Sequence, residues 1–65
     1  MKTITALSHE VGAILKDDVL VNEKNRFRSM DLCGEILEVA DETNDSFMRV
    51  TLWSWIGKVQ NKFQG

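Results

Sequence analysis

The chain of 65 residues contains no proline and no tyrosine, and it has a single cysteine, Cys33. The lack of proline argues against a linker or a polyproline ligand. Small secreted domains usually depend on several disulfides, so one cysteine favours a reducing compartment, and we expect a cytoplasmic protein. No apolar run approaches the length of a membrane span, so we expect no membrane partner.

Residues that carry chemistry are also scarce. His9 and Cys33 are the only conventional nucleophile or base candidates, and no local signature links them. Zinc requires about four nitrogen or sulfur ligands. The acidic segment 41–45 resembles the start of a calcium loop, but Leu52 stands where that loop needs a bidentate glutamate. We therefore predict no catalytic activity, no cofactor and no metal site.

The overall composition is that of an ordinary globular domain, with 43% hydrophobic and 28% charged residues. At this length we expect one domain, residues 1–65. The formal net charge of −2 argues against a wholly cationic nucleic-acid binder, although it allows a local basic patch.

Apolar residues near the N-terminus recur at the three-and-four spacing of a helical face. They are Ile4, Leu7, Val11, Ile14 and Leu15. This spacing predicts a helix over 4–16, with a hydroxyl of Thr3, Thr5 or Ser8 as its N-cap.

Beyond Asp18, β-branched residues and turn residues predict strands. We expect three strands, at 19–21, 26–41 and 47–56. Turns would lie at 22–25 and 43–46, and Gly34 would mark a kink in the long second strand. Helical spacing returns at 56–63. The predicted fold class is α+β, with an N-terminal helix packed on a three-stranded antiparallel meander and a short C-terminal helix. A small OB-like β-barrel, in which the N-terminus adds a strand, is the alternative.

The second turn fixes a register between the last two strands. With Glu42 opposite Phe47, the apolar residues of both strands share one face, which the N-terminal helix would cover. The pairs are Val39 with Val50, Leu37 with Leu52, and Cys33 with Ile56. Trp53 and Trp55 then point away from this core.

The second face of the predicted sheet is the candidate binding site. Its residues are Phe47, Arg49, Trp53 and Trp55, joined by Arg26 and Arg28 if the first hairpin continues the sheet. Aromatic rings beside guanidinium groups suit unpaired bases and their phosphates. Trp and Arg also dominate protein interfaces. A third interpretation is a second small core, in which the C-terminal segment covers the rings.

Residues 38–63 resemble the central hairpin of OB-folds of the replication protein A type. The matching segments are Val39-Ala40-Asp41-Glu42, Val50-Thr51-Leu52-Trp53 and Lys62-Phe63. The resemblance covers less than half of the chain, and 65 residues are few for a five-stranded barrel of usual length. It implies single-stranded nucleic-acid binding in a groove across the barrel.

The sequence thus predicts a small non-enzymatic binding module. Its leading ligand is single-stranded DNA or RNA, bound through the aromatic and arginine face. The alternative is a protein-binding regulator or inhibitor that acts through the same face, an accessory protein of the kind that mobile elements encode. Self-association through this face, as a homodimer, is a further expectation.

Overall fold

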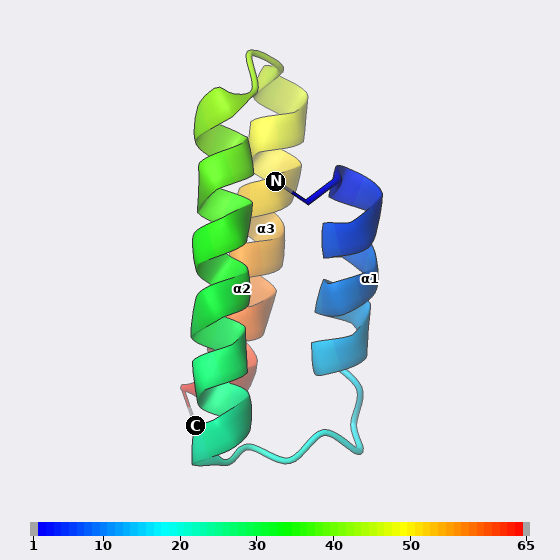
Figure 1. Cartoon of the computed structure of the whole chain (residues 1–65), viewed down its shortest axis with the longest axis vertical. Helices are drawn as coiled ribbons and strands as arrows, with labels where there is room; N and C mark the ends of the chain where they lie inside the picture. The colour runs from blue at the N-terminus through cyan, green and yellow to red at the C-terminus, as the bar shows by residue number, and fades with distance from the viewer. Residues whose placement is uncertain (1, 65) are drawn as a thin grey trace.

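The computed structural model describes residues 2–64, and these residues form three α-helices: α1 (Ile4–Ile14), α2 (Glu23–Glu42) and α3 (Ser46–Phe63) (Figure 1). Between residues 2 and 64 the chain has no strand. The predicted α+β meander is therefore wrong, and so is the OB-like barrel offered as its alternative. The protein has an all-α fold.

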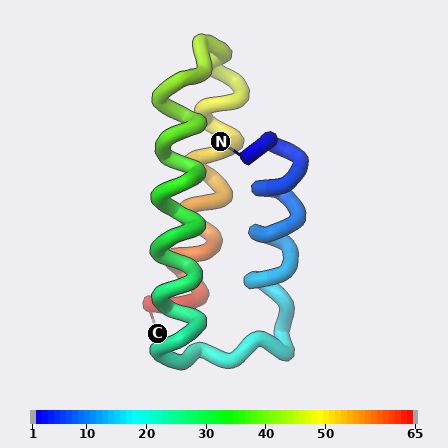
Figure 2. Tube along the Cα trace, in the orientation of Figure 1, coloured from blue at the N-terminus to red at the C-terminus, as the bar shows by residue number. Residues whose placement is uncertain are grey.

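α2 and α3 form an antiparallel helical hairpin, which the connection 43–45 closes at one end. We call this end the loop end, and the end that holds the start of α2 and the end of α3 the open end. α1 lies beside the hairpin and runs parallel to α3, and an extended connection leads from its last turn to the start of α2 (Figure 2).

Each helix begins at a side chain that accepts hydrogen bonds from first-turn amides. Thr3 Oγ1 accepts from the amide of Ala6 at 3.1 Å. Asn22 Oδ1 accepts from the amide of Asn25 at 2.8 Å. Asp45 Oδ1 accepts from two amides of α3, at 3.0 and 3.2 Å. These caps satisfy donors that a helix start otherwise leaves unpaired, so they fix where α1, α2 and α3 begin.

The core lies between the three helices and draws on each of them. Its buried apolar residues are Leu7, Val11, Ile14, Leu32, Cys33, Ile36, Ala40, Leu52, Ile56, Val59 and Phe63. In every helix they follow the spacing of three or four residues that keeps one helical face toward its neighbours.

The interpretation of 26–41 and 47–56 as strands fails because both segments carry a helical pattern of burial. In α2, Ser29, Leu32, Ile36 and Ala40 recur every three or four residues on the buried side. In α3, the spacing predicted for the tail at 56–63 extends back to Leu52. The strand predicted at 19–21 lies in the connection between α1 and α2.

The predicted turns and the kink change in the same way. Residues 23–25 of the first predicted turn are the first turn of α2, whereas the second turn lies near the true connection at 43–45. Gly34 sits in the interior of α2 rather than at a strand kink. The N-terminal helix predicted over 4–16 is confirmed for Ile4–Ile14 and ends two residues earlier.

Candidate interaction surface

Large apolar side chains remain exposed on the side of the hairpin that faces away from α1. Met30 and Leu37 on α2 are 62% and 46% exposed, and Val50 and Trp53 on α3 are 64% and 50% exposed. We call these four residues, together with Gly34 and Gly57, the hairpin face.

Helical geometry sets the direction of this surface. On α2, Leu32 and Glu35 line a hollow beside α1 together with Lys2 and Glu10. Two residues along a helix correspond to about 200° of rotation, so Met30 and Leu37 point to the opposite side. On α3, Lys62 contacts the end of α1. Trp53 lies nine residues earlier, which is about 180° of rotation.

The α2 and α3 members of the hairpin face lie side by side. In an antiparallel hairpin, residues equally far from the connection are neighbours. Counted from Asn44, Leu37 lies at the level of Val50 and Trp53, and Met30 lies at the level of Gly57. The hairpin face is therefore one continuous surface that spans both helices.

Within this surface, Arg49 and Trp53 form a cation–π pair. The guanidinium carbon of Arg49 lies 5.5 Å from the centroid of the Trp53 ring, one helical turn away. The Nε atom of Arg49 is buried and has no hydrogen-bond partner. The pair holds the arginine across the indole, and Trp53 as a whole residue remains half exposed.

Of the other four residues of the predicted site, Arg26 adjoins this surface, whereas Phe47, Trp55 and Arg28 lie elsewhere. Trp55 lies two residues from Trp53, on the opposite side of α3, where it packs against the core. Phe47 is 79% exposed in the first turn of α3. Arg26 and Arg28 are likewise separated around α2. Arg28 lines the hollow beside α1, whereas Arg26 lines a shallow groove next to Met30.

The sheet face predicted for Phe47, Arg49, Trp53 and Trp55, joined by Arg26 and Arg28 if the first hairpin continued it, is therefore wrong, because residues 26–55 lie in α2, α3 and their connection. Met30, Leu37 and Val50 were missed as surface residues. The signal that could have found two of them is a second helical stripe on α2, spaced three and four apart. Its members are Phe27, Met30, Gly34 and Leu37.

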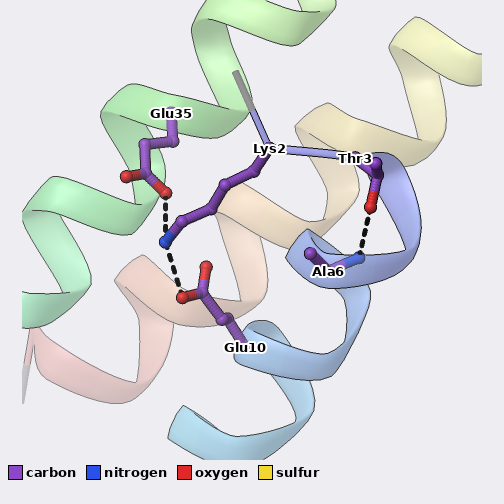
Figure 3. Close-up of polar contacts among 5 residues, drawn as sticks. All are labelled: Lys2, Thr3, Ala6, Glu10 and Glu35. Atoms are coloured by element: carbon purple, nitrogen blue, oxygen red, sulfur yellow. Dashed lines mark hydrogen bonds and ion pairs between the residues drawn. The ribbon is translucent and has the colours of Figure 1, made fainter.

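On the opposite side of α2, a charged cluster joins α1 to the hairpin (Figure 3). The Lys2 Nζ atom lies 2.6 Å from Glu10 Oε1 and 3.0 Å from Glu35 Oε2. The side-chain contact with Glu10, followed by that with Glu35, raises the pKa of Lys2 above its ordinary value of 10.5. A lysine held between two carboxylates remains a cation and has no tendency to act as a base. We therefore assign this cluster a structural role.

Cys33 also lacks the environment of a reactive residue. Its side chain is buried in the core. Burial disfavours the thiolate and raises the pKa of the Cys33 thiol. Among residues 2–64 there is no group of three or more side chains that could hold a metal ion.

Charge is separated along the hairpin. Around the loop end, residues 35–49 hold five acids, Glu35, Glu38, Asp41, Glu42 and Asp45, against a single base, Arg49. Around the open end, residues 16–30 and 57–64 hold six bases, Lys16, Lys24, Arg26, Arg28, Lys58 and Lys62, against three acids, Asp17, Asp18 and Glu23. Within α2 this order opposes the helix macrodipole, which favours acids at the start and bases at the end.

Comparison of the chain with models of known protein families, with curated proteins and with solved structures found no match in any of the three. None of the helices in the described part of the chain is long and apolar enough to span a membrane.

Proposed function

We propose that this protein is a non-enzymatic module that binds another polypeptide through the hairpin face. One observation carries the proposal: Met30, Leu37, Val50 and Trp53 are large, apolar and exposed on a single side of two neighbouring helices. A contiguous apolar surface of this kind on a small domain is typical of a site of protein association. Leu52 and Ile56 are buried in the core, and their packing holds α3, which carries part of this face, in place.

The arrangement favours a protein over single-stranded nucleic acid as the ligand. Nucleic-acid platforms use several open aromatic faces interleaved with cations. Trp53 is the one aromatic residue of the hairpin face, and Arg49 already lies over its ring; the exposed Phe27 and Phe47 are not members of this face. The acidic residues of the loop end, among them Asp41, would also repel phosphates.

A protein-binding role agrees with the accessory regulator or inhibitor that the sequence offered as an alternative. We propose that it acts in the cytoplasm, because a single buried cysteine suits a reducing compartment. The hairpin face is suited to a partner helix, which would pack its side chains into the gaps beside Gly34 and Gly57.

Site-specific photo-crosslinking in cells tests this proposal. A benzophenone side chain replaces Val50 on the hairpin face, or the exposed Thr5 on α1 as the matched control. We expect protease-sensitive adducts from position 50 and none from position 5. Addition of Leu37→Glu should abolish the adducts from position 50, because a buried unpaired charge opposes association.

Adducts of equal yield from both positions would contradict the proposal, and so would the absence of adducts from position 50. Adducts from position 50 that nuclease reduces to the size of the free chain would favour single-stranded nucleic acid and also contradict it.

A further inference from the structure

We infer that the polypeptide bound by the hairpin face is a second copy of this chain, packed antiparallel to the first. The inference rests on the proposed function and names its partner. In this dimer, the two-fold axis lies in the interface, perpendicular to the helices. α2 then packs on α2 of the second copy and α3 on its α3, and the loop end of each copy lies at the open end of the other.

Charge complementarity selects this arrangement. The loop end carries five acids against Arg49 and Lys2, which pairs with Glu35, and the open end carries six bases against three acids. Each end therefore has a net excess of three like charges, negative at the loop end and positive at the open end. An antiparallel pair brings opposite ends together, whereas a parallel pair would place acids against acids and bases against bases.

A single axis also places matching residues of the hairpin face opposite one another. The midpoint of Met30 and Leu37 lies between Cys33 and Gly34, and the midpoint of Arg26 and Asp41 is the same point. An axis there sets Met30 of one copy against Leu37 of the other, and Arg26 against Asp41. Arg26 and Asp41 lie on the same side of α2. They are fifteen residues apart, which corresponds to whole turns of the helix plus only about 60°.

On α3 the same axis brings a large residue against a small one. The midpoint of Trp53 and Gly57 is Trp55, which lies eleven residues after Asn44. The midpoint on α2, between Cys33 and Gly34, lies between ten and eleven residues before Asn44. The axis therefore crosses both helices at one level. It sets the exposed indole of Trp53 against Gly57 of the second copy, where no side chain blocks its approach.

Packing within one chain does not require glycine at position 34 or 57. A Cβ atom built at Gly34 or Gly57 meets no other atom within 4 Å. Glycine in a helix interior costs about 1 kcal/mol relative to alanine. A close approach by another helix explains why both glycines lie on the hairpin face.

The size of the surface suits a weak, reversible dimer. The hairpin face itself extends about 10 Å along each helix, and the whole outer side of the two helices, about 30 Å long and about 10 Å across each, presents roughly 600 Å². Burial of that whole side on each partner would reach only the lower limit of stable interfaces, since a standard interface buries about 800 Å² on each partner.

Sedimentation of the whole chain from micromolar to millimolar concentration tests the inference. We expect a reversible dimer whose dissociation constant rises with salt, because the charged ends contribute. Leu37→Glu should raise the dissociation constant at least about a hundredfold. The matched control, Thr5→Glu on α1, should leave it unchanged.

Variants that exchange the charges of Arg26 and Asp41 distinguish a second copy of this chain from any other partner. Arg26→Asp and Asp41→Arg should each weaken the dimer about tenfold, because the symmetry repeats every pair twice. The double variant should restore the wild-type value, since each copy then supplies both swapped charges. A double variant weaker than either single variant would overturn the antiparallel arrangement.

A monomer at all concentrations would overturn the inference. If position 50 still forms protein adducts in cells, the proposed function stands and only the identity of the partner is wrong. If the chain is monomeric and position 50 forms no adducts, both proposals fail.

Discussion

The Nζ atom of Lys62, in the last turn of α3, donates a hydrogen bond to the carbonyl oxygen of Ile14, at the end of α1, over 2.9 Å. The last carbonyls of a helix have no partners within it, and this end of the dipole favours a cation. The same ammonium group also contacts the carbonyl of Lys16. Lys62 therefore fixes the end of α1 to the hairpin, while Lys2 fixes its start.

Removal of this ammonium group should loosen α1. We expect Lys62→Met to lower the free energy of unfolding by about 1–2 kcal/mol, measured by urea denaturation, since a charged hydrogen bond is lost while the aliphatic stem remains. Lys58→Met is the matched control, because Lys58 is exposed and lies one turn earlier on α3. Equal losses for the two variants would show that the contact with Ile14 contributes nothing specific.

Val50 and Leu52 distinguish the helix from the strand that the sequence predicted. A strand with the predicted register places both residues in the core, whereas α3 exposes Val50 and buries Leu52 completely. We expect Leu52→Ala to lower the free energy of unfolding by about 2–5 kcal/mol. Val50→Ala should change it by less than about 0.5 kcal/mol in the monomer. Comparable losses at both positions would contradict the helical assignment.

The sequence supported the first helix better than the others for a physical reason. Between Ile4 and Ile14 no short apolar alternation competes with the helical spacing. In α3, the alternation of Val50 and Leu52 imitates a strand, although Asp45 is a strong N-cap signal and the helical spacing reaches Phe63. In this segment an apolar alternation of period two competes with the capping signal, and tertiary packing favours the helix.

The predicted binding site depended on whether the segment that holds Trp53 and Trp55 is a strand or a helix. A period of two places Trp53 and Trp55 on one side, while a period of 3.6 separates them by about 200°. Arg49 and Trp53, four apart, meet only in a helix, where the structure pairs them. The position of α1 could not be predicted from the pattern alone. The position of α1 decides which side of α2 is covered and which apolar side chains stay exposed. Lys2 and Lys62 attach α1 to a single side of the hairpin.

The glycines of α1 and α2 provide a test with opposite effects on folding and association. Gly12→Ala and Gly34→Ala should each raise the free energy of unfolding of the monomer by about 0.5–1 kcal/mol, because the new methyl group meets no other atom. Gly34→Ala should also weaken association, and Gly12→Ala should leave it unchanged. A stabilised Gly34→Ala variant that associates as tightly as the wild type would remove the reason given for glycine at this position.

Lys2 should contribute stability that depends on pH. Its pKa in the folded chain is raised above the ordinary value of 10.5, chiefly by Glu10 and then by Glu35. The contribution is therefore complete below 10.5 and is lost as the pH rises through the higher folded value. Urea unfolding of Lys2→Met and of the wild type should differ at neutral pH and converge at alkaline pH. A difference that persists unchanged above the folded pKa would exclude the ion pairs as its cause.

Nuclear magnetic resonance of the nitrogen-labelled chain, recorded as its concentration rises into the millimolar range, tests the hairpin face most directly. We expect amide signals to shift for residues around Met30, Leu37 and Trp53, whereas those of the exposed side of α1, around His9 and Gly12, stay constant. Shifts centred on α1, or no shifts in any helix, would show that the chain does not associate through the hairpin face.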